Sequence, residues 1–135
     1  MMIENNNNYK YCLLVDSNFE DQEIFETAID LIGLNIECST VIDGAQCLEL
    51  LNNKNFVPDF IFIDINFKAM DGVECLKAIK KIAHLQNTPL IIYSDPTFLN
   101  YMNKIKSLKI HAFLTKPIEV TFLCKKLAKI FKEKT

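Results

Sequence analysis

The sequence contains no arginine, because all fifteen of its positive side chains are lysine. Arginine supplies the planar guanidinium fork that clamps phosphate and reads guanine, so its absence argues against direct binding of nucleic acid. No apolar run approaches the roughly 20 residues that span a bilayer, so we expect no membrane segment. Residues 1–10 are rich in asparagine and lack the apolar stretch of a secretory signal. We therefore expect a cytoplasmic protein.

The cysteines lack the paired spacing of a disulfide framework or a zinc site. Five are present, an odd number, and no two form a C-x-x-C pair. We expect them to be small, buried, reduced residues. They are Cys12, Cys38, Cys47, Cys75 and Cys124.

Charge is nearly balanced overall but unevenly distributed along the chain. The formal net charge is −2, yet residues 1–64 hold twelve acids and two lysines, whereas residues 65–135 hold five acids and thirteen lysines. The basic half could attract an acidic partner, or it could simply form a solvated charged face.

Short apolar runs alternate with amphipathic stretches along the whole chain. The runs at 11–15, 60–63, 90–93 and 110–114 suit strands buried on both faces of a parallel sheet, and residues 36–40 alternate like an edge strand. Apolar stripes at 24–32, 98–108 and 120–131 predict helices, the first stopped by Gly33. Asp43 can cap the start of a helix that runs to about residue 52, and Asp71 can cap the start of another that runs to about residue 83. These elements predict a (βα)5 fold with helices on both faces of the sheet.

The composition shows no linker, repeat or second domain. Half of the 135 residues are hydrophobic, and this length is typical of one domain. We expect residues 1–8 to form a disordered leader and residues 9–135 to form the domain.

Polar residues follow four of the predicted strands. In an open parallel sheet, ligands bind beyond the carboxyl ends of the strands, so these side chains should meet at one rim. Two carboxylates, a hydroxyl and an ammonium group can together hold a divalent cation and a phosphoryl group. The residues that follow the strands are Asp16 and Ser17; Asp64 and Asn66; Ser94 and Asp95; and Thr115, Lys116 and Pro117.

Three motifs resemble the receiver domain of bacterial two-component response regulators. They are the segment 13–16 ending in Asp16, the segment 58–66 followed by 70–72, and the segment 115–117. The resemblance covers about residues 9–131 and depends on the combination of motifs in this order. It implies a flavodoxin-like, doubly wound (βα)5 fold, with a five-stranded parallel sheet of order 2-1-3-4-5.

The resemblance also implies roles for individual residues. Asp64 matches the aspartate that accepts a phosphoryl group from a sensor histidine kinase or a phosphotransfer protein. Mg²⁺ is implied as a cofactor. The other implied roles are Asp16, Asp64 and the backbone carbonyl of Asn66 as metal ligands, Lys116 as the partner of the phosphoryl oxygens, Ser94 as the switch hydroxyl, Phe113 as the switch aromatic, and a cis bond between Lys116 and Pro117.

Three departures from the family pattern bear on this chemistry. Ser17 stands where the family usually has a second acid, so we expect weakened Mg²⁺ binding. Asp95 follows Ser94, where the family prefers a small residue, and its carboxylate should narrow the phosphoryl path. Phe67 and Lys68 replace the usual Met-Pro, and Lys68 could reach the pocket as a second cation.

Three functions remain open at this point. The first is a single-domain receiver that gates a separate partner protein through the surface of its fourth helix, fifth strand and fifth helix. Such a receiver is not an enzyme beyond its own phosphorylation and dephosphorylation. The second is a degenerate receiver that acts as a phosphorylation-independent interaction module. The third is a haloacid-dehalogenase-like phosphatase, against which Asn66 stands where an acid is needed. Seven lysines crowd the expected docking face: Lys104, Lys106, Lys109, Lys125, Lys126, Lys129 and Lys132.

Overall fold

Apolar side chains that point alternately to the two faces of the strands build a sheet with a core on each face. The computed structural model describes residues 9–66, 72–116 and 118–133. Within them, five parallel strands form one sheet of order β2-β1-β3-β4-β5, as expected. The strands are β1 (Lys10–Val15), β2 (Ile36–Val41), β3 (Phe60–Ile63), β4 (Leu90–Ser94) and β5 (Ala112–Thr115).

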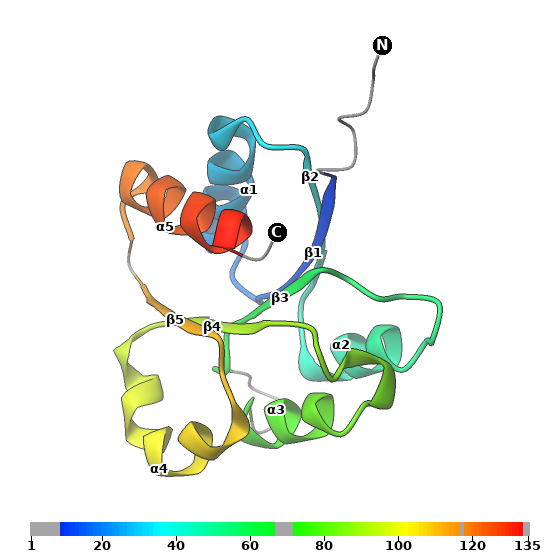
Figure 1. Ribbon diagram of the computed structural model, residues 1–135. Helices are drawn as coiled ribbons and strands as arrows, with labels where there is room; N and C mark the ends of the chain where they lie inside the picture. Colours follow the sequence, from blue (N-terminus) through cyan, green and yellow to red (C-terminus); the bar gives the residue numbers. More distant parts are fainter. Residues whose placement is uncertain (1–8, 67–71, 117, 134–135) are drawn as a thin grey trace.

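The helices cover both faces of this sheet (Figure 1). On one face lie α1 (Phe19–Ile32) and α5 (Val120–Glu133), and on the other lie α2 (Gly44–Leu51), α3 (Gly72–Lys80) and α4 (Met102–Ile105). Successive strand residues point to opposite faces, so Leu13 joins the core beneath α2 and α3 while Leu14 joins the core beneath α1 and α5. Because both cores are apolar, the strand runs are continuously hydrophobic.

Local signals in the sequence set several helix ends. Asn18 caps α1 by accepting the Asp21 amide at 2.9 Å, and Asp43 caps α2 by accepting the Gln46 amide at 2.8 Å. Gly33 ends α1 with a φ of 70°, in the left-handed region that favours glycine. The predicted Asp43 cap and Gly33 stop are both confirmed.

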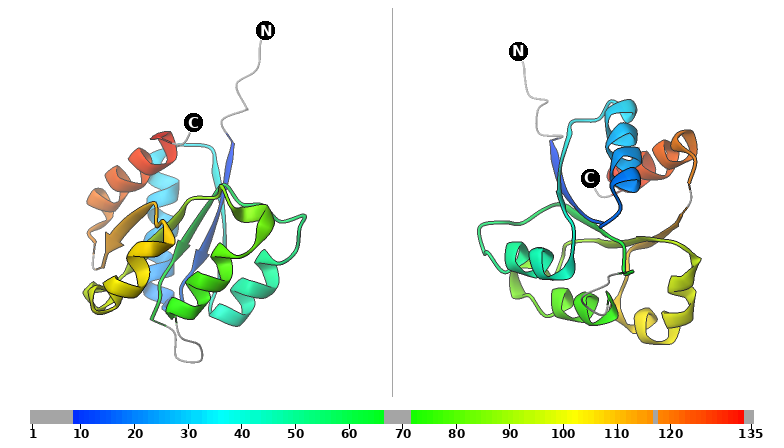
Figure 2. Two further views of the ribbon diagram at one scale, coloured as in Figure 1. Left: turned by 60° about the horizontal axis from the view of Figure 1, so that its bottom comes forward. Right: turned by 180° about the vertical axis from the view of Figure 1, so that it is seen from behind.

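The predicted helix over 98–108 is wrong as a single helix. The segment is broken into η3 (Pro96–Tyr101), α4 and η4 (Lys106–Leu108), of which η3 and η4 are 3₁₀ turns. Several asparagine, threonine and serine residues in this segment have low helix propensity, and buried anchors at Phe98 and Ile105 fix its path instead. The two views of Figure 2 place this segment on the same face as α2 and α3.

Smaller differences concern the ends of elements and the cysteines. The helix predicted to reach residue 83 ends at Lys80, and a separate turn, η2 (Ala83–Leu85), follows it. The run predicted to begin at residue 110 becomes a strand only at Ala112, after Lys109 turns the chain with a φ of 58°. All five cysteines are free thiols, but Cys38 and Cys124 are only partly buried.

Some predictions fall outside the described residues. They are the leader at 1–8, the start of a helix at residue 71, the cis bond at Pro117, and the contribution of Phe67 and Lys68 to the pocket. Over the described ranges, none of the helices has the length and apolar character needed to cross a membrane.

Candidate functional site

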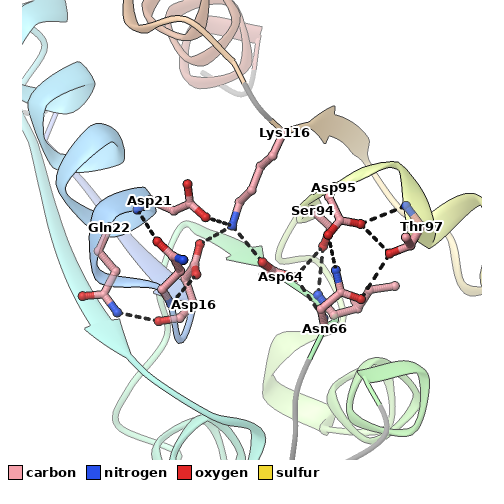
Figure 3. Close-up of polar contacts among 11 residues, drawn as sticks. Asp16, Asp21, Gln22, Asp64, Asn66, Ser94, Asp95, Thr97 and Lys116 are labelled. Atoms are coloured by element: carbon pink, nitrogen blue, oxygen red, sulfur yellow. Dashed lines mark hydrogen bonds and ion pairs between the residues drawn. The ribbon is translucent and has the colours of Figure 1, made fainter.

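The ends of β1, β3, β4 and β5 meet at one rim, where the four predicted pocket residues cluster (Figure 3). Backbone hydrogen bonds continue the sheet one residue past these strands and so hold the side chains in place. The Asp16 amide donates to Val41, the Asp64 amide to Val15, and the Lys116 amide to Ser94. The predicted clustering of Asp16, Asp64, Ser94 and Lys116 is confirmed.

The Lys116 ammonium group lies at the centre of the cluster. Its Nζ atom donates to Asp16 Oδ2 at 2.6 Å, to Asp64 Oδ2 at 2.7 Å and to Asp21 Oδ2 at 3.0 Å. These bonds match the three donors of an ammonium group. The Lys116 side chain is only 8% exposed, and that of Asp16 is fully buried. Two buried charges at this distance are tolerable because each compensates the other.

Burial and charge act in opposite directions on the pKa values of this pair. Burial lowers the pKa of Lys116, but the hydrogen bonds to Asp16 and Asp64 outweigh it, so its pKa is raised above the ordinary value. Burial raises the pKa of Asp16, and the bond to Lys116 offsets only part of that rise. The ammonium also lies 4.7 Å from the centroid of the Tyr93 ring, and burial raises the pKa of Tyr93 to about 12. Lys116 is therefore positively charged at neutral pH.

The second oxygen of Asp64 accepts neutral donors. Asp64 Oδ1 accepts the Asn66 amide at 2.9 Å and the Ser94 hydroxyl at 3.0 Å. The Ser94 oxygen in turn accepts the Ile65 amide at 2.9 Å, and Ser94 is completely buried. The Asp64 side chain, by contrast, is 14% exposed. The carboxylate is thus oriented from both sides while one edge stays open to solvent.

Asp95 lies beside Asn66 rather than free at the mouth of the site (Figure 3). Its carboxylate caps η3, accepting the Thr97 amide at 2.9 Å and also the Thr97 hydroxyl. It accepts the Asn66 side-chain amide at 3.1 Å as well. The hydrogen bonds from Thr97 lower the pKa of Asp95. Asp95 is therefore an ionised cap of η3 that is linked to Asn66, and the narrowing of the phosphoryl path by its carboxylate stays a prediction.

Phe113 and Ser17 take no part in the hydrogen bonds and ion pairs described above for the charged groups of the cluster. Phe113 is 36% exposed and stacks on Phe98, with ring centroids 5.5 Å apart and planes inclined by 19°. Ser17 is exposed. The sequence predicted that Phe113 lies on the fifth strand and that Ser17 follows Asp16 at the rim, but it did not predict the stacking of Phe113 on Phe98.

Asp21 is the pocket residue that the sequence reasoning missed. It follows the Asn18 cap by three residues, and helical side chains lean toward the helix N-terminus. Because α1 starts beside the end of β1, its first turn faces the rim. An acidic residue in the first turn of this helix could therefore have indicated a further pocket residue. Its contact with Lys116, 95 positions away in the sequence, depends on tertiary structure.

The oxygen atoms at the rim fit Mg²⁺ by their chemistry. Mg²⁺ needs only one or two carboxylates, because it keeps several waters. Asp16 and Asp64 already converge on one cation, the Lys116 ammonium, and the Asn66 backbone adds a carbonyl oxygen on the same loop. Among the described residues, no group of three or more histidine, cysteine, aspartate or glutamate side chains is placed to hold a metal by itself. A bound ion would therefore depend on waters and the backbone as well as on these carboxylates.

The arrangement offers an accessible carboxylate flanked by a hydroxyl and an ammonium group. Such a carboxylate can act as a nucleophile, while the flanking donors can stabilise oxygen atoms that gain negative charge.

Comparisons with known proteins agree with this geometry. The family model described as the response regulator receiver domain matches residues 12–128. The chain is 26% identical over 119 residues to the chemotaxis protein CheY of Pseudomonas aeruginosa, covering 88% of this chain and 94% of that protein. It is 29% identical over 112 residues to the sensor histidine kinase CheAY of Helicobacter pylori, covering 82% of this chain but only 14% of that much longer protein.

A solved structure shares the fold. It is the receiver domain of the sensor histidine kinase PA1611 from Pseudomonas aeruginosa, described with a magnesium ion coordinated in its active-site cleft. The TM-score is 0.76 at 19% identity, with 93% of this chain and 96% of the other covered.

Proposed function

This chain belongs to the response regulator receiver domain family, and from that premise we propose that Asp64 accepts a phosphoryl group from the histidine of a sensor kinase or phosphotransfer protein. One observation supports this most strongly: the exposed edge of Asp64 is flanked by the Ser94 hydroxyl at 3.0 Å and the Lys116 ammonium at 2.7 Å. Donors placed on both sides of a nucleophile suit the transfer of a group rich in oxygen.

The transfer needs no acid or base from the protein to form its new bond. An oxygen of the Asp64 carboxylate bonds to phosphorus in line with the departing nitrogen of the phosphohistidine. The P–N bond breaks and its electron pair stays on that nitrogen, so the ring leaves as neutral imidazole because its other nitrogen already carries a proton. Lys116 and Ser94 donate to the phosphoryl oxygens during this exchange.

We assign the metal ligands of this site to Asp16, Asp64 and the Asn66 carbonyl. When bound, Mg²⁺ would supply positive charge against the phosphoryl oxygens. The related receiver domain that is described with magnesium supports this assignment by analogy. Since Ser17 supplies no carboxylate, we expect the affinity for Mg²⁺ to be weak.

The output of this receiver is proposed to be a change in the surface formed by α4, β5 and α5. Ser94 and Phe113 lie on the neighbouring strands β4 and β5, so movement of the first can reach the second. A groove of about 380 Å³ lies beside Phe113, lined also by Phe122 and Lys126. Lys126 and Glu119 are the charged residues of its lining, and the lysine-rich second half of the sequence suits an acidic protein surface better than nucleic acid. Receiver domains are generally not enzymes, and we propose no turnover beyond self-phosphorylation and self-dephosphorylation of Asp64.

Incubation with acetyl phosphate and Mg²⁺, followed by intact-mass analysis, tests this proposal. We expect the wild-type chain to gain one phosphoryl group that is lost in alkali, as an acyl phosphate is. Asp64→Asn should gain none, whereas Asp30→Asn, which alters an exposed acid on α1, should behave as wild type. Absence of the modification together with no release of phosphate would favour a phosphorylation-independent interaction module. Rapid release of phosphate from the donor without accumulation of the modified chain would favour a phosphatase.

A further inference from the structure

Asp21 places a third carboxylate on Lys116, although no pocket motif includes it. Its Oδ2 atom lies 3.0 Å from the Lys116 Nζ atom, and Figure 3 shows it approaching from the α1 side, opposite Asp64. The side chain of Asp21 is 29% exposed, against 14% for Asp64 and none for Asp16. Asp21 is therefore the partner of Lys116 that lies nearest to solvent.

The backbone around Asp21 is held firmly, so this contact does not depend on a loose side chain alone. The Asp21 amide donates to the Asn18 cap at 2.9 Å. The next residue, Gln22, donates its side-chain amide to the Asp16 carbonyl at 2.5 Å. The first turn of α1 is thereby tied to the end of β1, which carries the most buried carboxylate of the pocket.

The contact between Asp21 and Lys116 changes the net charge of the pocket. With Asp16 and Asp64 alone, one ammonium and one divalent cation would leave a net positive charge. Asp21 adds the carboxylate that Ser17 lacks, and three carboxylates would then balance Lys116 and the cation. The balance matters because the groups are largely withdrawn from water, where uncompensated charge is costly.

We propose that Asp21 is the positioning residue for Lys116 and supplies the negative charge, though not the metal ligand, that is missing at Ser17. It gives the ammonium a partner on the α1 side that stays available while Asp16 and Asp64 engage the cation and the phosphoryl group. Without Asp21, the ammonium would have only Asp16 and Asp64 as carboxylate partners, and it would compete with the cation for their oxygens. The part concerning phosphoryl transfer rests on the proposed function, whereas the effect on Lys116 and on Mg²⁺ does not.

A titration with Mg²⁺, followed by NMR, tests the inference in the wild-type chain and four variants. We expect Asp21→Asn to weaken Mg²⁺ binding about tenfold, as loss of a supporting partner commonly does. Glu23→Gln, which removes an exposed acid two residues further along the same helix, should leave the affinity unchanged. Asp21→Glu should retain most of the affinity, and Ser17→Asp added to Asp21→Asn should restore it.

The ¹⁵Nζ signal of the Lys116 ammonium provides a readout that a purely structural role would not move. At neutral pH it should shift in Asp21→Asn and stay in place in Glu23→Gln, while the backbone spectra of both remain folded. Wild-type Mg²⁺ affinity and an unmoved ammonium signal in Asp21→Asn would overturn the inference. If the wild-type chain accepted no phosphoryl group, the proposed function would fail, but these two measurements would still decide the role of Asp21.

Discussion

Single residues at the rim hold several elements together. The Lys116 ammonium at the end of β5 joins carboxylates from β1, β3 and α1 in a setting that is mostly withdrawn from water. Removing one partner of a buried charge cluster leaves the other charges uncompensated, which costs more than the intact pair contributes.

Lys116→Met should destabilise the fold in a pH-dependent way. At neutral pH we expect a loss of about 3 kcal/mol, because the carboxylates around the ammonium are left unpaired. The folded-state pKa of Lys116 is raised above its ordinary value of 10.5, so its contribution is complete below that pH and is lost as the pH rises toward the folded-state pKa. Urea unfolding at neutral pH and above pH 10.5 should therefore show the two chains converging only at the higher pH. A constant difference would contradict the assignment.

Ser17→Asp should strengthen Mg²⁺ binding. Ser17 follows Asp16 directly at the rim, and a carboxylate there adds a charged oxygen ligand for a hard cation. Calorimetric titration of the wild-type, Ser17→Asp and Ser17→Asn chains separates charge from side-chain size. Equal affinity in all three would show that residue 17 lies outside the metal shell.

Gly72→Ala should disturb the site from the start of α3. A Cβ atom on Gly72 would overlap the backbone carbonyl of Ile65, and the Ile65 amide holds Ser94. We expect a loss of about 1–3 kcal/mol together with altered amide signals at Ile65 and Ser94. Gly33→Ala is the comparison: its left-handed φ makes alanine strained, yet nothing lies within 4 Å of the added atom. Amide signals at the rim that stay in place in Gly72→Ala would refute the prediction.

At the scale of elements, a pair of aromatic rings joins the broken segment before β5 to β5 itself. Phe98 comes from η3 and is buried, whereas Phe113 comes from β5 and is partly exposed. Within the described part of the chain, these nearly parallel rings form the one aromatic pair that joins the two elements. Because the two rings are in contact, a movement of η3, which follows Ser94 along the chain, can displace Phe113 on β5.

The Phe98 and Phe113 rings should be energetically coupled. In a double-mutant cycle with Phe98→Leu and Phe113→Leu, we expect a coupling of about 0.5–1.5 kcal/mol in the free energy of unfolding. A second cycle that combines Phe98→Leu with Phe122→Leu should be additive, because Phe122 lies on α5 and is 53% exposed. Additivity in the first cycle would mean that the stack contributes nothing specific.

At the scale of the whole molecule, the charges separate across the sheet. The acid-rich half of the sequence forms β1, β2, α1 and α2, while the lysine-rich half forms β4, β5 and the helices that follow (Figure 1). Such a distribution steers an acidic partner toward the β5 edge and weakens with salt, because exposed charges are screened over roughly 10 Å.

Reversing the charge of Lys125, Lys126 and Lys129 to glutamate should slow association with an acidic chain. We expect slower binding to immobilised polyglutamate at low salt, a smaller difference at high salt, and unchanged modification of Asp64 by acetyl phosphate. A triple variant of Lys54, Lys77 and Lys81 changes the net charge equally but on other elements, and should have the smaller effect. If both triple variants slow binding equally, net charge rather than the α5 face governs association.

The sequence by itself determined the order of the elements and four members of the rim. Each strand is a local apolar run. The residue that follows a run lies at the carboxyl end of the parallel sheet, and this position does not depend on how the helices pack. Asp16, Asp64, Ser94 and Lys116 could therefore be placed together from their positions alone. Caps such as Asp43 and Gly33 were equally readable, because a cap acts on its own neighbours.

Only the tertiary structure decided the contacts that cross between elements. The bond from Asp21 to Lys116 depends on how the first turn of α1 lies relative to the end of β5. The stack of Phe98 on Phe113 depends on where η3 lies relative to β5. The hydrogen bond between the Asp95 carboxylate and Asn66 likewise depends on how the loop after β3 packs beside η3, where Asp95 also accepts the Thr97 amide. Periodicity determines which face of an element is buried, but the distance that a side chain must reach is set by the packing of whole elements.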